Sequence, residues 1–189
     1  MYDHYIELNI EGVTRGRDLQ HAFILILQEK GGQRLYPILL EKEGYDQVEA
    51  ALIHKDYTCS RLMNQLANRV GMTMLGVRIL LPHNGRTQAL LDFELINEVV
   101  SITVSAAEAT IAALETKCSF WIEPSRLDIQ SKTKHDEGQM ALSLYAMNEK
   151  LLEEALESAV EEDHFELAAV LRDELKRRKQ SLIEDITDN

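Results

Sequence analysis

The stretch AFILILQEKGGQRLYPILL, residues 22–40, decides the fold class. Its unbroken apolar run at 22–27 is typical of a β-strand that is covered on both faces. The Gly31-Gly32 pair then favours a turn, and residues 34–40 predict a second strand. Pro37 cannot donate a backbone hydrogen bond, which favours a sheet edge or an irregularity at that position. A β-sheet is therefore the framework on which the other elements are placed.

The segments around this hairpin mix strand and helix patterns. Residues 5–13 alternate between apolar and polar, as strands do, whereas residues 45–54 and 60–70 have helical spacing. Ser60 is expected to cap the second helix and Gly71 to end it. Further strands are predicted at 77–81, 88–93, 99–104 and 119–122, with a turn at 82–85 and a helix at 106–115. Strands with inserted helices predict an α+β domain around one mixed sheet.

Composition limits the classes of function. The chain has 189 residues, 45% of them apolar, and a formal charge of −12, which suits one domain with an appendage. The acidic balance disfavours general nucleic-acid binding, because phosphate contacts need a basic face; local basic patches remain open. No apolar run is long enough to cross a bilayer, and the start of the chain does not resemble a signal peptide. A soluble, cytoplasmic protein is expected.

Cysteine and histidine give no sign of a metal or redox centre. Cys59 and Cys118 lie far apart and match no metal or redox spacing. Their apolar or helical surroundings favour buried free thiols, which indicates a reducing compartment. The six histidines have no ligand spacing either. No cofactor is therefore expected.

The character of the sequence changes near residue 122. Residues 1–122 carry a net charge of −4 and residues 123–189 a net charge of −8. The polar segment 130–139, which contains Gly138, is typical of a linker. The predicted organisation is a domain at 1–127, a linker at 128–141 and a helical hairpin at 142–182.

The hairpin is predicted from two apolar stripes. In the first, apolar side chains recur at three- and four-residue steps from Leu144 to Val160, and in the second from Phe165 to Leu175. Asp163 and Glu166 form a capping-box-like start for the second helix. The cations at 176–179 are expected to end it, where they favour the helix dipole.

Two such short helices bury their stripes poorly by themselves, since a pair below roughly 40 residues is marginally stable alone. The apolar faces therefore need a partner. Three partners remain open: the chain's own domain, a second copy and another protein.

The run DHFELAAVLRDEL at 163–175 resembles the core of the UVR motif, which excision-repair subunits and Clp-protease adaptors share. The hallmarks of this motif are an acidic turn followed by Phe-Glu-x-Ala-Ala-x-x-Arg-Asp. The resemblance implies that the hairpin binds a protein partner or a second copy. Small alanines would allow close helix approach, the phenylalanine would anchor, and the Arg-Asp pair would be structural. The partner-binding residues implied in this way are Phe165, Glu166, Ala168, Ala169, Arg172 and Asp173.

Residues 5–127 resemble the bifunctional nuclease family, an α+β domain with DNase and RNase activity in some members. The resemblance rests on IELNIEGVT at 6–14, AFILILQE at 22–29, RLYPILL at 34–40, EATIAALET at 108–116 and FWI at 120–122. Some members of that family carry a UVR motif at their C-terminus, so the two resemblances support each other.

The family's polar signature is mostly replaced in this chain. A histidine and an aspartate become Ser60 and Arg61, and an aspartate and an arginine become Thr103 and Ser105. Only one acid is kept, as Glu108, which is the sole candidate catalytic residue. Phosphodiester hydrolysis needs carboxylates for metal ions, or a general base with a cationic stabiliser.

The sequence therefore predicts a member of the nuclease family with weak or no nuclease activity. Such a protein would act through interactions of its hairpin, as a homo-oligomer, expected to be a dimer. The alternative is an active DNase/RNase that uses Mg²⁺ or Mn²⁺ and other site residues.

Overall fold

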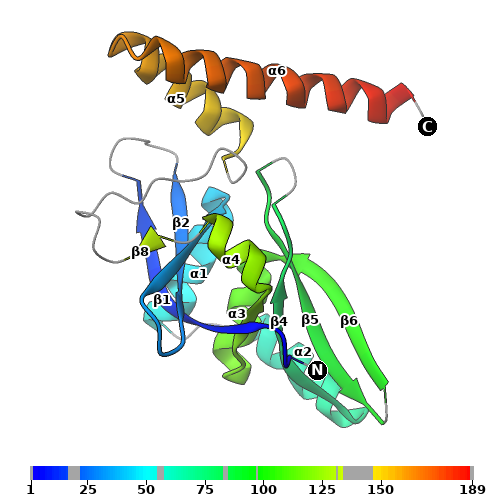
Figure 1. The fold of residues 1–189 in the computed structure, drawn as a ribbon. Coiled ribbons are helices and arrows are strands. Elements are labelled where there is room, and N and C mark those ends of the chain that lie inside the picture. The colour runs from blue at the N-terminus through cyan, green and yellow to red at the C-terminus, as the bar shows by residue number, and fades with distance from the viewer. Residues whose placement is uncertain are drawn as a thin grey trace.

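The computed structural model describes residues 2–16, 22–54, 58–82, 85–96, 98–130, 132–133 and 147–187. A curled sheet carries helices on it, and a pair of antiparallel helices lies at one end of the molecule (Figure 1). The strands are β1 (Ile6–Arg15), β2 (Phe23–Glu29), β3 (Arg34–Leu40), β4 (Met72–Ile79), β5 (Gln88–Leu95), β6 (Glu98–Ser105), β7 (Phe120–Ile122) and β8 (Lys132–Thr133). The helices are α1 (Lys42–His54), α2 (Thr58–Arg69), α3 (Ala106–Thr116), α4 (Pro124–Gln130), α5 (Glu149–Glu161) and α6 (Phe165–Thr187).

One mixed sheet has the strand order β6-β5-β4-β7-β1-β2-β3-β8. Every neighbouring pair is antiparallel except β4 and β7, which run parallel. The predicted α+β class is therefore confirmed. Most predicted elements are also present, although β4 starts at Met72, five residues before its predicted start. Ser60 was expected to cap α2 but lies within its first turn, because the helix already begins at Thr58.

The β2–β3 hairpin is covered on both faces, as its apolar run predicts. Leu25 and Leu27 are fully buried in the main core beside α1. Ile24, on the other face, packs against Leu151 of α5. Pro37 pairs with Ile26 of β2, whereas β8 pairs with β3 at residues 34 and 35. Within the described residues, Pro37 therefore stands where β3 is an edge, and its missing N–H costs no ladder bond.

A buried ion pair holds the other half of the sheet together. Arg78 on β4 donates to both carboxylate oxygens of Asp92 on β5, at 2.6 and 2.7 Å. Ser101 on β6 and Tyr2 also donate to this carboxylate, at 2.6 and 3.0 Å. Asp92 is fully buried, so these four donors replace the water that it loses. The Tyr2 ring stacks on Trp121, which ties the N-terminal segment to β7.

The sheet domain reaches further than residue 127. Leu127 on α4 is fully buried in the main core, and Arg126 donates to the carbonyl of Ile79 at 3.1 Å. The short strand β8 then closes the sheet at residues 132–133. Both elements extend into the stretch that the sequence predicts as a linker, because Leu127 and Arg126 dock α4 on the sheet domain. Residues 134–146, including Leu144, lie outside the described residues.

The expectation of two buried thiols was wrong. Cys118 is half-buried, but Cys59 is exposed on α2. Cys59 has helical neighbours, as predicted, but the face of α2 that carries it is not covered by any described segment of the chain. Among the described helices, none is long and apolar enough to traverse a bilayer.

The C-terminal hairpin has the predicted two helices with different ends. Asp163 has a left-handed φ of 60° in the turn, and α6 begins at Phe165. The N-cap position is therefore His164, and Leu167 three residues later cannot complete a capping box, so the predicted box of Asp163 and Glu166 was wrong. The second helix continues to Thr187, so the cations at 176–179 lie in its interior. Arg177, Arg178 and Lys179 pair with acids on the two helices rather than with the helix dipole.

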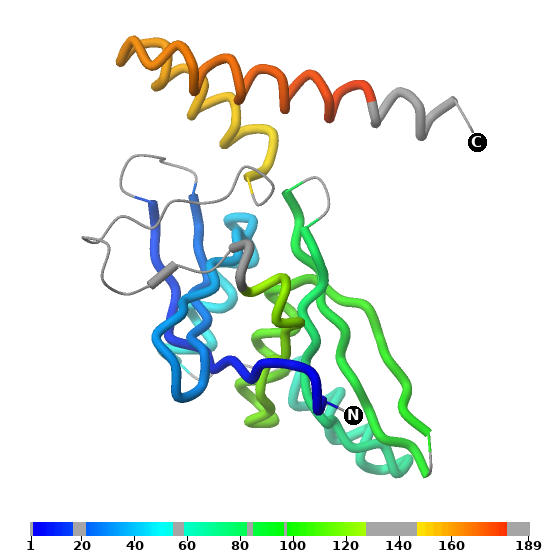
Figure 2. Tube along the Cα trace, in the orientation of Figure 1, coloured from blue at the N-terminus to red at the C-terminus, as the bar shows by residue number. Residues whose placement is uncertain are grey.

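The hairpin docks on the sheet domain through the first turn of α5. Leu151 is fully buried against Ala22, Ile24 and Leu39 at the ends of β2 and β3. Gly85, before β5, lies so close that a Cβ there would stand 2.4 Å from the Cα of Asn148. Figure 2 follows the start of α5 to these strand ends, whereas the rest of the hairpin projects away from them.

Candidate protein-binding surface

The two helices of the hairpin share a small core of their own. It consists of side chains that recur at helical spacing on both helices: Leu152, Ala159, Ala168, Leu171 and Leu175. Ala168 has no side chain beyond Cβ, so α5 and α6 can approach closely there. This core occupies one face of each helix, and the other faces lie outside it.

A buried arginine fastens the open end of the hairpin. Arg178 on α6 donates to the carbonyl of Met147, before α5, at 2.5 Å and to Glu174 at 2.7 Å. Glu174 also accepts two hydrogen bonds from Arg177, both at 2.8 Å. The bonds from Arg177 and Arg178 outweigh the effect of burial and lower the pKa of Glu174 to about 2. Glu174 therefore orients Arg178, and the bond from Arg178 to the Met147 carbonyl links α6 to the start of α5.

Lys179 identifies which outer faces of the two helices lie on the same side. Its ammonium group is 3.4 Å from both Glu149 and Glu153 on α5. On α5 these acids continue at helical spacing to Leu156 and Val160. On α6 the row that ends at Lys179 contains Phe165, Ala169, Arg172 and Lys176. Since residues at three- and four-residue steps share a helix face, the two rows form one surface, which we call the motif face.

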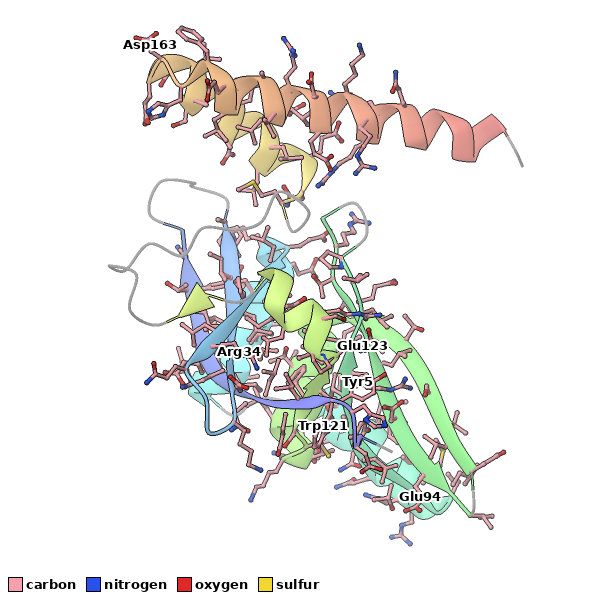
Figure 3. All side chains as sticks on the ribbon, in the orientation of Figure 1. Tyr5, Arg34, Glu94, Trp121, Glu123 and Asp163 are labelled. Carbon is pink, nitrogen blue, oxygen red and sulfur yellow. The ribbon has the colours of Figure 1, made fainter. Side chains whose placement is uncertain are left out.

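The motif face is apolar at the turn and charged at the open end. Phe165 is 65% exposed and Val160 is 51% exposed, although both are large apolar side chains. They flank the turn, at the end of α5 and the start of α6, with half-buried Ala169 and Leu156 behind them. Arg172 and Lys176 follow along α6, both exposed. Figure 3 places Asp163 at the outermost tip of this projecting end.

The residues predicted to bind a partner fall into three groups. Ala168 belongs to the hairpin core, as close helix approach requires. Phe165, Ala169 and Arg172 lie in the α6 row of the motif face. Glu166 and Asp173 lie on the outer side of α6 and are exposed. The Arg172 guanidinium donates to Asp173 at 3.1 and 3.2 Å, so these two do form a pair, although an exposed one.

Leu156, Val160 and Lys179 are members of the motif face that the sequence did not indicate as partner-binding residues. The sequence does contain the pattern that places them there, because the 4-3-4 spacing of each helix continues through these positions. The missing information was the side on which the helices meet. The hairpin core and the ion pairs of Lys179 supply it.

Glu108 has a structural role in this chain. It forms a capping box with Ser105 at the start of α3: each residue's side chain binds the other's backbone N–H. The hydrogen bonds from Ser105 lower the pKa of Glu108. The carboxylate is therefore ionised and already engaged, which suits a helix cap rather than a general base.

A pocket of about 510 Å³ lies beside this cap. Its polar lining includes Glu41, Glu43, Arg86 and Glu108, and Asn148 contributes from the start of α5. The carboxylate of Glu41 is paired with Arg86 at 2.9 Å. Across the described ranges, no three histidine, cysteine, aspartate or glutamate side chains gather in a way that could hold a metal ion.

Comparison with known proteins supports one of the two resemblances. Residues 150–181 match the model of the UvrB/uvrC motif, which spans most of α5 and α6. No match supports the resemblance of residues 5–127 to the bifunctional nuclease family. No curated protein matches the chain. The motif that is found is thus the hairpin, and the hairpin carries exposed apolar side chains at its turn.

Proposed function

We propose that this protein acts by binding another protein, with the motif face of the hairpin as its docking surface for a helix. The single observation that carries the proposal is the exposure of Phe165 and Val160 next to a hairpin core that is already filled. Apolar side chains in contact with water at the tip of a projecting element are typical of a surface that a partner covers. The match to the UvrB/uvrC motif supports it independently.

The chemistry of the motif face defines the kind of partner. A helix that lies along the face would meet apolar side chains at the turn and two cations further on. Arg172 and Lys176 are exposed there in a chain of net charge −12. An amphipathic helix with apolar residues at one end and acidic residues at the other fits this order. The docked first turn of α5 would hold the surface at a fixed place on the domain.

Site-specific photo-cross-linking tests the proposal in the full-length protein. A photoreactive phenylalanine analogue replaces Phe165 in one variant and Val170 in the other, which is the matched control. Val170 is 50% exposed and lies on α6 outside the motif face. We expect one discrete adduct from position 165, whose cross-linked peptide is helical and amphipathic, and none from position 170. Equal adducts at both positions, or no adduct at 165, would contradict the proposal.

The competing function is metal-dependent cleavage of DNA or RNA. The capping role of Glu108 speaks against it, since the carboxylate is held by Ser105. Purified protein is expected to leave single- and double-stranded DNA and RNA intact with Mg²⁺ or Mn²⁺. Cleavage that disappears in Glu108→Ala but not in Glu43→Ala would establish the nuclease and overturn the interpretation of Glu108 as a cap only.

A further inference from the structure

The second unusual surface of the molecule is the outer edge of β6. This strand is the last in the sheet, and in the described part of the chain it pairs with β5 alone. Its backbone groups on the other side therefore have no strand beside them there. The opposite end of the sheet is different, because it ends in the two-residue strand β8. Short terminal strands protect a sheet from further pairing, and long ones invite it.

Nothing in β6 prevents another strand from pairing with it. Its eight residues, EVVSITVS, contain no proline and no basic residue, and Glu98 at one end is the one acid. Its register with β5 is regular throughout, without a bulge. Val99 and Ile102 are 46% and 44% exposed. Natural edge strands normally carry lysines, prolines or bulges that block association, and β6 has none of these.

Helix α2 has its amphipathic character reversed. Its polar Asn64 faces the rest of the domain and donates to Glu115 of α3 at 2.9 Å. Its apolar residues form a stripe that is more than half exposed: Leu62, Met63, Leu66 and Val70. A surface helix normally turns its apolar stripe to the core. The reversal indicates that this stripe packs on something outside the described chain.

The α2 stripe and the β6 edge lie at the same end of the domain. Met72, just after α2, pairs with Leu95, just before the β5–β6 turn. Ile96 in that turn is the most exposed large apolar residue described, at 80%. Figure 1 places α2 beside the lower half of β4, near this turn. Both elements expose apolar side chains at this end of the domain, and we call the two together the α2–β6 surface.

We infer that a second copy of this chain covers the surface, with β6 paired antiparallel to β6 of its partner and α2 packed beside the junction. The strand is complementary to itself. In an antiparallel pair, opposed residues share a face of the sheet, so a two-fold axis through the middle of β6 sets Val100, Ile102 and Val104 against the same three residues of the other copy. Glu98 then lies at the Ser105 end of the partner strand, and no two charged residues of β6 oppose each other.

This pairing closes at two copies. Each chain has one such edge, and a two-fold contact uses it completely, so no further copy can add. The surface is also separate from the motif face: in Figure 3, Glu94 near the β5–β6 turn and Asp163 at the tip of the hairpin lie at opposite ends of the molecule. A dimer built on β6 would therefore present two hairpins, both still accessible to partners.

Sedimentation equilibrium of the full-length protein tests the inference with four variants. Ile102→Lys places a charge in the strand pair, and Leu66→Lys places one in the α2 stripe. Leu81→Lys is the matched control, because Leu81 is 54% exposed and lies outside this surface. Phe165→Glu disables the motif face instead. Each lysine reduces the net negative charge, so weaker association of a lysine variant cannot arise from overall repulsion.

We expect the unaltered protein, Leu81→Lys and Phe165→Glu to be dimers, and the dissociation constant to rise at least tenfold in Ile102→Lys and Leu66→Lys. Thermal unfolding must confirm that the variants are folded. Hydrogen exchange of the unaltered protein supplies a test without any substitution: β6 amides should be more protected well above the dimer dissociation constant than well below it. A monomer at all concentrations, a dimer lost only in Phe165→Glu, or a dissociation constant unchanged by Ile102→Lys or Leu66→Lys would each overturn the inference.

Discussion

The carboxylate of Glu108 accepts a hydrogen bond from the Ser105 backbone N–H at 2.9 Å and another from the Ser105 hydroxyl at 2.7 Å. The Ser105 hydroxyl in turn accepts from the backbone N–H of Glu108 at 3.2 Å. The one acid that the sequence offered as a candidate catalytic residue is thus part of a reciprocal helix cap. Its chemistry serves the start of α3, where the backbone N–H groups otherwise have no partner in the helix.

Removal of this cap should lower stability. We expect Glu108→Ala to reduce the free energy of unfolding by about 1 kcal/mol, the usual value of a helix cap. Glu43→Ala is the control, since Glu43 is an exposed acid in the first turn of α1 and its loss should change stability by less than about 0.5 kcal/mol. Urea unfolding of the three proteins measures both values. Equal stability of Glu108→Ala and the unaltered protein would contradict the capping role.

The strands and helices were readable from the sequence wherever burial follows a simple period. The run at 22–27 even predicted a strand covered on both faces. Leu151, more than a hundred residues later in the chain, covers the second face. Short elements were missed for a physical reason. In the described part of α4, Leu127 is the buried apolar residue and Arg126 hydrogen-bonds to the Ile79 carbonyl, and one buried residue in a polar segment gives no periodic signal.

The partner-binding residues were only partly accessible to sequence. The motif identified Phe165 and Arg172, which lie together on one face, but it grouped them with Ala168, which is buried. Which of the matched residues face outward depends on how α5 meets α6, and that depends on contacts such as the one between Lys179 and Glu153. The exposed thiol of Cys59 was wrongly expected to be buried for a similar reason: an apolar stripe does not reveal whether its cover belongs to the same chain.

The ion pair between Arg78 and Asp92 should show strong coupling. Burial disfavours the Asp92 carboxylate, but hydrogen bonds from Arg78, Ser101 and Tyr2 outweigh it and lower its pKa. Arg78→Met leaves that charge buried with neutral donors only, so we expect a loss of about 3–5 kcal/mol. The Arg78→Met/Asp92→Asn double variant should lose clearly less than the sum of the two single variants. Denaturant unfolding of the four proteins gives the coupling energy, and simple additivity would show that the pair is not coupled.

The docking of the hairpin should depend on Gly85. This residue has a φ of +74°, and an added Cβ would lie 2.5 Å from the carbonyl oxygen of Met147. Gly85→Ala should therefore displace the first turn of α5 from the sheet. Hydrogen exchange is expected to quicken in residues 148–152 and to stay unchanged in α3.

Gly32→Ala is the matched control for that experiment. The nearest atoms to a Cβ at Gly32 belong to the flexible side chain of Glu29, which can move aside. Exchange in residues 148–152 should therefore match the unaltered protein. If Gly85→Ala and Gly32→Ala give the same exchange in α5, close contact at Gly85 does not position the hairpin.

The stability of the hairpin should fall in acid through Glu174. Hydrogen bonds from Arg177, together with those from Arg178, lower the folded-state pKa of Glu174 from the ordinary glutamate value of 4.5 to about 2. A carboxylate whose pKa is lower in the folded state binds protons preferentially when the chain is unfolded. Its contribution to stability is therefore complete above pH 4.5 and is lost as the pH falls through about 2.

Glu174→Gln removes this contribution and leaves Arg178 buried without its anionic partner. The difference in unfolding free energy between the unaltered protein and Glu174→Gln should be constant above pH 5 and shrink toward pH 2. Glu157→Gln, an exposed position on α5, should instead follow the unaltered protein at every pH. If the difference in unfolding free energy between the unaltered protein and Glu174→Gln does not vary with pH, the ionised Glu174 carboxylate does not stabilise the hairpin.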